Sequence, residues 1–237
     1  VPAKNYGHDL DAMAAAISEK TRLVFVTNPN NPTGTWLTQT EVTAFMAKVP
    51  SDVVVVLDEA YFEYVDEADY CNGLTLFAQY PNLVVTRTFS KAYGLASLRV
   101  GYGISSPEIA DLMNRVRPPF NVNSFALAAA VATLNDAEYV AESKAVNDAG
   151  MAYLTQSFDK LGLPYIPSVG NFISFEIPSS AGISAALVDQ KLLAAGVIVR
   201  PIANYEMPNH LRVSIGTQSE NETFIAALSK ILADANS

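Results

Sequence analysis

The sequence predicts an α/β protein with a mostly parallel central sheet, followed by a smaller C-terminal α+β region. Three observations support this class. Short apolar strands alternate with amphipathic helices, polar residues follow directly after several strands, and a Pro- and Asn-rich segment at 117–123 ends the alternation. Ligands of such sheets bind outside the carboxyl ends of the strands, so the polar residues there are candidates for function.

Capping residues and apolar spacing justify the elements of the first half. Asp9 precedes a helical pattern as an N-cap, and Thr38 with Glu41 forms a capping box. Residues 53–57 are apolar on both faces, as expected for a buried parallel strand. The expected elements are helices at 9–19 and 38–48 and strands at 23–27, 53–57, 83–88 and 98–104, the last carrying Arg99 at its start.

The second half is predicted to contain a long helix that leads into a smaller region. We expect this helix at 124–161, after the linker. The predicted domains are 1–120, part of a large domain; 121–160, linker and connecting helix; and 161–237, a small C-terminal domain. The small domain is expected to contain strands near 172–177, 197–200 and 211–215 and helices near 184–195 and 220–234.

Composition excludes several classes of function. The chain has 237 residues, of which half are apolar, and a net charge of −9. Without a run of Lys or Arg it has no surface for nucleic acid or anionic lipid, and no stretch is long enough to span a bilayer. Cys71 is the only cysteine, which indicates a buried residue in a reducing, cytoplasmic setting. His8 and His210 stand alone, so no metal site is predicted.

Polar side chains at four strand ends suit one kind of ligand. A lysine amine condenses with an aldehyde, and a hydroxyl beside a guanidinium can hold a phosphate. A buried carboxylate can keep a pyridine nitrogen protonated, while a phenol and an amide can donate to an oxygen on the same ring. The residues are Asn31, Asp58, Tyr61, Ser90, Lys91 and Arg99.

Three motifs in this order resemble fold-type I pyridoxal-phosphate aminotransferases, and among them most closely the histidinol-phosphate aminotransferases. They are Asn-Asn-Pro-Thr-Gly at 30–34, Asp-Glu-Ala-Tyr at 58–61 and the segment from Ser90 to Tyr102. The similarity extends over the whole chain and includes 6–11, 117–123 and 210–217.

The resemblance implies pyridoxal 5'-phosphate as cofactor and a role for each candidate. Lys91 matches the lysine that becomes covalently joined to the cofactor and moves the substrate proton. Asp58 matches the partner of the ring nitrogen, Tyr61 and Asn31 match donors to the ring oxygen, and Ser90 and Arg99 match phosphate ligands.

The resemblance also implies substrate-binding residues. Arg212 and Arg200 match anion-binding arginines, and Asn171 matches a position near the substrate. For both arginines a surface ion pair is the alternative interpretation. The resemblance further allows a cis peptide at Asn31–Pro32 and implies a homodimer. Because Val1 is neither an initiator Met nor part of a signal peptide, we expect the sequence to begin inside a longer protein, with the N-terminal third of the family absent.

The leading hypothesis is transamination between histidinol phosphate and imidazole acetol phosphate, with glutamate and 2-oxoglutarate as the amino donor and 2-oxo acid pair. The first alternative is an aromatic amino-acid aminotransferase, since both substrates need a flat ring pocket. A decarboxylase of a phosphate-bearing amino acid on the same fold is a third hypothesis. An inactive fragment that takes up no cofactor is the non-enzymatic one.

Overall fold

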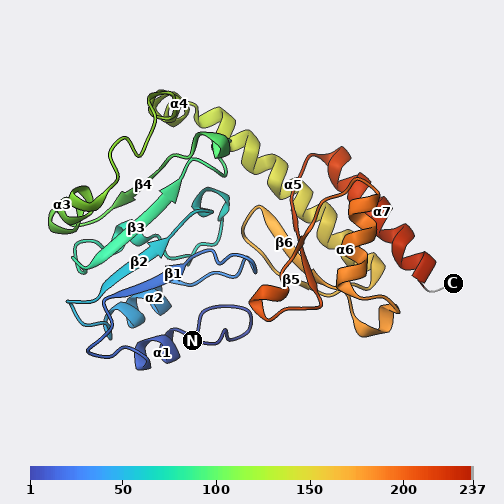
Figure 1. The fold of residues 1–237 in the computed structure, drawn as a ribbon, viewed down its shortest axis with the longest axis horizontal. Coiled ribbons are helices and arrows are strands. Elements are labelled where there is room, and N and C mark those ends of the chain that lie inside the picture. The colour runs from blue at the N-terminus through green and yellow to red at the C-terminus, as the bar shows by residue number, and fades with distance from the viewer. Residues whose placement is uncertain (236–237) are drawn as a thin grey trace. The chain divides into compact units, whose positions relative to one another are not determined.

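The computed structural model describes residues 1–235 and divides into two compact units. Unit 1 comprises Val1–Asn31 and Thr35–Ala141, and unit 2 comprises Pro32–Gly34 together with the chain from Glu142 onward. Figure 1 shows the two sheets around which these units are built. The expected domain boundaries at 120 and 160 lie on either side of the junction between Ala141 and Glu142.

Unit 1 is built on a four-stranded sheet in the order β1-β2-β3-β4. Strands β1 (Leu23–Thr27), β2 (Val54–Asp58) and β3 (Leu83–Thr88) are parallel, and β4 (Gly101–Ile104) runs antiparallel to β3. The α/β class with a mostly parallel sheet is therefore confirmed. The predicted bounds of β1 and β3 agree with the structure, and β2 lies one residue later than predicted.

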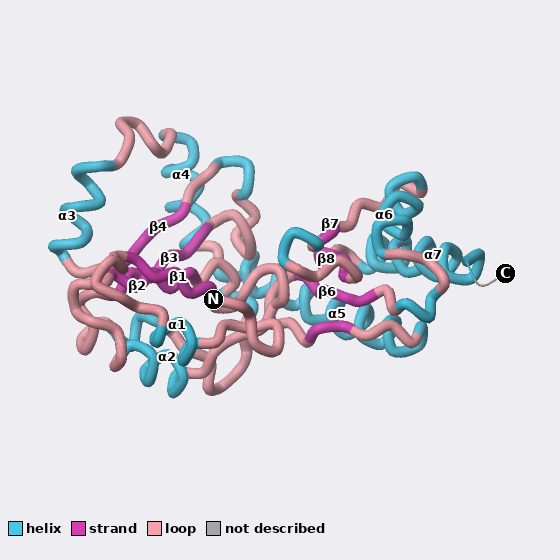
Figure 2. The backbone as a smooth tube through the Cα atoms, turned by 60° about the horizontal axis from the view of Figure 1, so that its bottom comes forward, coloured by secondary structure: helices cyan, strands magenta, loops and turns pink. Residues whose placement is uncertain are grey.

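Helices α1 (Leu10–Ala15) and α2 (Gln39–Met46) lie on one face of this sheet, as Figure 2 shows. The predicted caps are present: Asp9 Oδ1 accepts from the Ala12 amide at 3.0 Å, and Thr38 forms its capping box with Glu41. The expected extension of α1 to residue 19 is wrong, because side chains of Ser18 and Thr21 accept backbone N–H groups in a turn that competes with the helix. The core under this face includes Val26, Phe45, Met46, Val55, Leu57, Leu83 and Val85.

Two other expected elements differ from the structure. Arg99 does not lie in a strand: it ends the 3-10 turn Ala96–Leu98 with a φ of 55°, and β4 begins at Gly101. This left-handed residue precedes the return of the chain alongside β3. The expected single helix at 124–161 is two helices, α4 (Ser124–Leu134) and α5 (Ala137–Leu161), because Asp136 Oδ1 accepts from the Tyr139 amide and starts a new N-terminus.

Helix α3 (Pro107–Val116) follows β4 in the chain and was not expected. Its start carries a recognisable signal, because Ser106 caps the helix and Pro107 occupies its first turn. None of the helices within residues 1–235 combines the length and the apolarity needed to cross a membrane.

The cis peptide implied for Asn31–Pro32 is wrong: within residues 1–235 the cis bond is Asn28–Pro29. The chain changes direction at Asn28, where it leaves β1. There the buried Asn28 side chain is held by Leu37, whose N–H donates to Oδ1 at 2.8 Å and whose carbonyl accepts from Nδ2 at 3.3 Å. These two bonds fix the start of the loop that carries Asn31.

Unit 2 contains an antiparallel sheet in the order β5-β6-β8-β7. Its strands are β5 (Tyr165–Ile166), β6 (Phe172–Glu176), β8 (His210–Ser214) and β7 (Arg200–Pro201), of which β5 was not predicted and β7 begins only where the predicted strand ends. Helices α5, α6 (Ala185–Ala194) and α7 (Gln218–Ala235) supply the rest of its core. This core includes Leu154, Phe158, Ile173, Phe175, Val188, Leu192, Leu211 and Leu228.

The segment Pro32–Gly34, which we name the strap, packs with unit 2 although its sequence neighbours belong to unit 1. The buried Ser174 hydroxyl donates to the Pro32 carbonyl at 2.6 Å, and the Val169 amide donates to the Gly34 carbonyl at 3.1 Å. Gly34 has a φ of 77°, and a Cβ there would lie 1.9 Å from Ser168 Oγ and 2.8 Å from Ser168 Cα. Both the conformation and the close approach require glycine.

We expect Gly34→Ala to destabilise the protein more than Gly162→Ala. Gly162 has a similar φ of 66° but nothing within 4 Å of the added Cβ. The left-handed conformation costs about 1–2 kcal/mol in both variants, and overpacking adds about 1–3 kcal/mol at position 34. Urea unfolding followed by circular dichroism measures both. Equal destabilisation of the two variants would contradict the packing of the strap.

Candidate active site

The carboxyl ends of the parallel strands of unit 1 carry one polar row. Thr27, Asp58 and Thr86 stand in register on β1, β2 and β3, with side chains on the same face. The Thr86 hydroxyl donates to Asp58 Oδ1 at 3.1 Å. This bond fixes the half-buried carboxylate, and its Oδ2 receives no hydrogen bond from the residues described. Asp58 Oδ2 can therefore accept a hydrogen bond from a cationic N–H group of a ligand placed beside this row.

Three predicted residues meet in the segments that follow these strands. Tyr61 follows β2 by three residues and is 5% exposed. Its hydroxyl accepts from Asn31 Nδ2 at 3.1 Å, and Lys91 Nζ lies 5.2 Å from its ring centroid. Asn31, Tyr61 and Lys91 follow β1, β2 and β3 respectively, so the parallel order of the strands brings them together.

Ser90 and Arg99 form a second contact in unit 1. Arg99 Nη1 donates to Ser90 Oγ at 3.3 Å and to the Ala96 carbonyl at 2.8 Å. The Ser90 amide in turn donates to Thr88 Oγ1 at 3.0 Å, which ties this contact to the end of β3. A hydroxyl and a guanidinium held side by side can bind an oxyanion. Arg99 makes both bonds from a left-handed backbone conformation, at the end of the turn that precedes β4.

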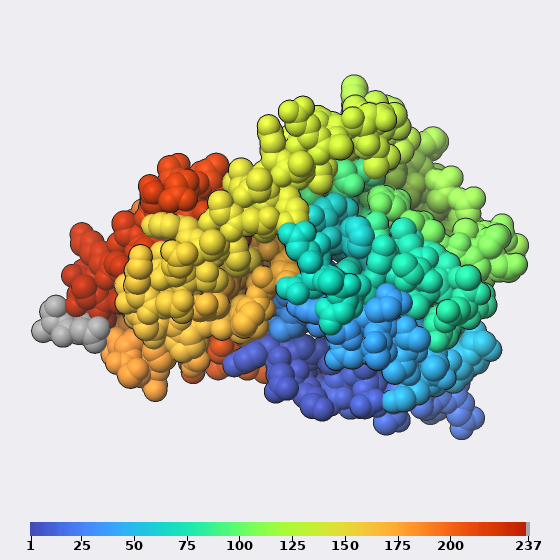
Figure 3. All heavy atoms as spheres, turned by 180° about the vertical axis from the view of Figure 1, so that it is seen from behind, coloured from blue at the N-terminus to red at the C-terminus, as the bar shows by residue number. Residues whose placement is uncertain are grey.

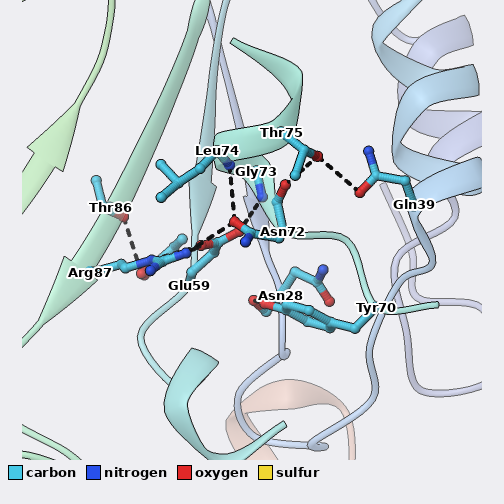
Figure 4. Close-up of polar contacts among 11 residues, drawn as sticks. Asn28, Gln39, Glu59, Tyr70, Asn72, Gly73, Leu74, Thr75, Thr86 and Arg87 are labelled. Carbon is cyan, nitrogen blue, oxygen red and sulfur yellow. Dashed lines mark hydrogen bonds and ion pairs between the residues drawn. The ribbon is translucent and has the colours of Figure 1, made fainter. Parts of the chain in front are cut away.

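A buried ion pair lies on the opposite face of the same strands and was not singled out from the sequence. Figure 4 shows Glu59 between Arg87 and the loop that contains Asn72 and Gly73. Glu59 Oε2 accepts from Arg87 Nε at 2.9 Å and Nη2 at 2.7 Å, and Oε1 accepts from the Gly73 amide at 2.6 Å. Burial raises the pKa of Glu59, while the Gly73 amide and Arg87 act against the rise. The available sequence signal was an arginine in a strand that begins with three buried apolar residues.

His8 supports the end of β1. Its Nε2 accepts from the Thr27 amide at 3.2 Å and lies 3.0 Å from Thr27 Oγ1, which itself donates to Asn30 Oδ1 at 2.6 Å. Burial lowers the pKa of His8. The Thr27 carbonyl, 3.1 Å from Nε2, can accept from the protonated ring and raises the pKa by less. Folding therefore favours the neutral imidazole of His8. Through Thr27, this ring connects the N-terminal segment to the loop that carries Asn31.

The candidates of unit 2 lie on and beside its sheet. Arg200 and Arg212 are opposite each other on β7 and β8, so both side chains leave the same face. The Arg212 guanidinium carbon lies 5.0 Å from the Phe172 ring centroid, and Leu211 and Val213 are buried on the other face, as the sequence alternation predicted. Asn171 precedes β6, and its carbonyl accepts from the Ile215 amide at 2.9 Å.

Other reactive groups do not form a competing site in the part of the chain described. Within residues 1–235 no three His, Cys, Asp or Glu side chains are grouped so that they could hold a metal ion. Cys71 is fully buried, and burial, with a smaller contribution from Glu59, raises the pKa of its thiol to about 12. This thiol is a packing residue of the unit 1 core, as predicted.

The arrangement in unit 1 suits a flat, phosphorylated aldehyde. It offers a primary amine at Lys91, a carboxylate fixed on one oxygen at Asp58, and an oxyanion clamp at Ser90 and Arg99. All six residues predicted for this ligand lie at the carboxyl ends of β2 and β3, in the loop after β1, or in the turn before β4.

Comparison with known proteins identifies the family. The chain matches the aminotransferase class I and II family over residues 1–228. It is 59% identical over 235 residues to histidinol-phosphate aminotransferase 2 of Pseudomonas fluorescens Pf-5, and 56% identical over 234 residues to histidinol-phosphate aminotransferase 1 of Nitrosococcus oceani. Each alignment covers 99% of this chain and 62% of the relative.

A solved structure gives the same result. The histidinol-phosphate aminotransferase of Sinorhizobium meliloti, in complex with pyridoxal-5'-phosphate, matches with a TM-score of 0.89 and 31% identity, over 98% of this chain and 63% of that one. The chain thus spans somewhat less than two thirds of the length of these relatives. It belongs to the class I and II aminotransferase family.

We expect the stability of unit 1 to fall as the pH is lowered from 7 to about 5, in part through His8. In the unfolded chain a histidine titrates near 6.5. Since the pKa of folded His8 is lower, the unfolded state binds more protons in this window and is favoured. Urea unfolding at several pH values, followed by fluorescence of the single Trp36, measures the effect. His8→Gln should make the stability less dependent on pH.

His210→Gln is the matched control. The pKa of His210 is also lowered by burial, but His210 lies in unit 2 and Trp36 in unit 1. It should leave the pH dependence of the Trp36 transition as in the parent. An unchanged slope in His8→Gln would contradict the assigned role of His8.

Proposed function

We propose that this chain provides the lysine-bearing and anion-binding parts of a pyridoxal-phosphate-dependent histidinol-phosphate aminotransferase. The amino group would pass between histidinol phosphate and 2-oxoglutarate, and imidazole acetol phosphate and glutamate are the other members of the two pairs. The substrate assignment is supported by relatives of 56% and 59% identity that carry this name.

The observation that carries the proposal is the position of Lys91. Its Nζ lies 5.2 Å from the centroid of the Tyr61 ring, and Lys91 and Tyr61 follow the ends of β3 and β2, the strands that carry Thr86 and Asp58. Tyr61 in turn accepts a hydrogen bond from Asn31. An amine, a fixed carboxylate and a hydrogen-bonded phenol at one edge of a parallel sheet are the groups that pyridoxal phosphate requires.

Each residue of unit 1 has a distinct task in this proposal. The cofactor, when bound, supplies an electron sink for the bond electrons released at the substrate Cα. Asp58 would keep the ring nitrogen protonated through the oxygen that Thr86 leaves open. Tyr61 and Asn31 would orient the ring oxygen, Ser90 and Arg99 would bind the phosphate, and Lys91 Nζ would take the proton from Cα and return it.

Arg212 binds the anionic group of the substrate in this proposal, and Arg200, opposite it on the neighbouring strand, adds positive charge. Phe172 packs against the Arg212 guanidinium and limits its side-chain freedom. Asn171 directly precedes β6, the strand that pairs with β8. These contacts favour a planar, bidentate recognition of phosphate that a lysine could not reproduce.

A second copy of the chain is the proposed partner. Helix α4 is almost entirely apolar, yet only Ala126 and Ala130 are buried, while Phe125 is 81% exposed. Phe120, just before α4, is 96% exposed. The α3–α4 segment, coloured green to yellow-green in Figure 3, lies at the molecular surface. An apolar surface of this kind is typical of a subunit interface.

A cytoplasmic location is part of the same proposal. The thiol of Cys71 is free, and the chain has no second cysteine with which it could pair. Free thiols are typical of proteins in a reducing compartment. The location agrees with a role in the synthesis of histidine, to which the named reaction belongs.

Steady-state kinetics of the intact protein that contains this chain test the proposed reaction. We expect amino transfer from histidinol phosphate to 2-oxoglutarate to be faster than transfer from phenylalanine, with no release of carbon dioxide. Lys91→Ala should abolish both turnover and the visible absorption band of the covalently held cofactor. Lys20→Ala, an exposed lysine of the same unit, is the control that should retain both.

Each contrary outcome selects another hypothesis. Faster turnover of phenylalanine would favour an aromatic aminotransferase, and carbon dioxide release a decarboxylase. A visible band that survives in Lys91→Ala would exclude Lys91 as the attachment site.

Arg212→Gln should lower kcat/KM for histidinol phosphate about 10- to 100-fold, since charge-assisted hydrogen bonds contribute about 1.5–3 kcal/mol. The same variant should change kcat/KM for unphosphorylated histidinol by much less. Lys230→Gln removes one positive charge elsewhere in the same unit and should affect neither substrate. An equal loss with both substrates would assign Arg212 a structural role.

A further inference from the structure

We propose that Glu59 and Arg87 are positioning residues that fix Asp58 and Tyr61 for the cofactor ring. This inference rests on the proposed function, because it concerns how the ring-binding side chains are held. It assigns a functional task to two side chains that bond each other on the sheet face opposite Asp58 and Thr86.

The first step of the argument is the alternation of the two strands. Asp58 and Glu59 are consecutive and leave opposite faces of the sheet, and so do Thr86 and Arg87. The Thr86 hydroxyl bonds Asp58 on one face, and the Arg87 guanidinium bonds Glu59 on the other. Between them the Glu59 amide donates to the Thr86 carbonyl at 2.8 Å. The ion pair therefore clamps the same backbone that places Asp58.

The second step is that both oxygens of the Glu59 carboxylate accept hydrogen bonds. Glu59 is completely buried, with Arg87 on Oε2 and the Gly73 amide on Oε1. A side chain at position 73 has no room, since a Cβ would lie 2.6 Å from Val85 Cγ2 and 2.7 Å from Leu57 Cδ2. The backbone of the 72–73 loop thus reaches the carboxylate directly, and little freedom is left to Glu59.

The third step connects Arg87 to Tyr61. The guanidinium carbon of Arg87 lies 3.6 Å from the Phe62 ring centroid, and Phe62 is the neighbour of Tyr61. This stacking holds the short turn in which the Phe62 amide donates to the Glu59 carbonyl and the Tyr64 amide to the Tyr61 carbonyl. Arg87 Nη2 also donates to Asn72 Oδ1 at 3.1 Å. One guanidinium therefore fixes β2, the Tyr61 turn and the 72–73 loop together.

The fourth step is energetic. A buried ion pair is costly to desolvate, and an apolar pair of similar volume is often at least as stable. Burial lowers and the Glu59 carboxylate raises the pKa of Arg87, with a net rise, whereas burial raises the pKa of Glu59 against the opposing effect of Arg87 and the Gly73 amide. An apolar pair would not fix the relative orientation of the two strands in the same way, because it has no fork of N–H groups and no acceptor oxygens to form directional hydrogen bonds. Geometry, rather than stability, is the property that these two side chains provide.

Three variants separate positioning from stability: Glu59→Gln, Arg87→Lys, and the uncharged double variant Glu59→Gln/Arg87→Met. Each single variant disturbs the geometry of the pair. In addition, Glu59→Gln removes one of its two charges, and Arg87→Lys keeps the charge but loses the planar fork of N–H groups. The double variant removes both charges together, so neither is left buried without its partner. Asp11→Asn, which breaks the exposed pair between Lys48 and Asp11, is the matched control.

The first measurement is amide hydrogen exchange of the intact protein without cofactor. We expect exchange at residues 62–65 to rise at least tenfold in all three variants, while exchange in α2 stays as in the parent. Asp11→Asn should change neither segment. An equal rise in both segments, or no rise at 62–65, would show that the pair contributes only global stability and would overturn the proposal.

The second measurement is the dissociation constant for pyridoxal phosphate, obtained by absorbance titration of the same proteins. It should increase at least tenfold in the three variants and stay unchanged in Asp11→Asn. Unchanged affinity in the double variant would overturn the proposal. Failure of the proposed function has a different signature: the parent itself would show no covalent cofactor band, whereas the exchange result would still report on the pair.

Discussion

The register between β2 and β3 is the constraint on which the site of unit 1 depends. Because side chains alternate along a strand, the pairing of Asp58 with Thr86 places both on one face of the sheet and sends Glu59 and Arg87 to the other. If the pairing of β2 and β3 slipped by one residue, Asp58 would no longer stand opposite Thr86, and Glu59 would no longer stand opposite Arg87. The Glu59 amide donates to the Thr86 carbonyl, just beyond the paired residues Asp58 and Thr86. The side chain of the same residue forms the ion pair with Arg87.

The fold was largely predictable where local signals and tertiary packing agree. The strands β1 and β3, the caps at Asp9 and Thr38, and the alternation around Arg212 could all be predicted because each rests on a pattern within a few residues. The gathering of Asn31, Tyr61 and Lys91 was also predictable, since the carboxyl ends of parallel strands meet at one edge.

The remainder depended on contacts that a local pattern cannot show. Arg99 lies next to apolar residues typical of a strand, but its left-handed backbone is set by the return of β4 along β3. Asn135 and Asp136 interrupt a helical pattern only because Asp136 caps the following helix. Glu59 resembles a solvated neighbour of Asp58 in the sequence, since nothing local shows that Arg87 and Gly73 approach it.

Because the strap belongs to unit 2, the chain connects the two units at three places. The chain passes from one unit to the other at 31–32, 34–35 and 141–142, so a single cut at the last junction would not release unit 2 with all its contacts. A C-terminal half exchanged between homologues would leave the Ser174 hydroxyl facing a strap inherited from the other parent. Recombination within this family is therefore constrained to keep the Asn-Pro-Thr-Gly motif together with a segment that lies about 140 residues later in the sequence.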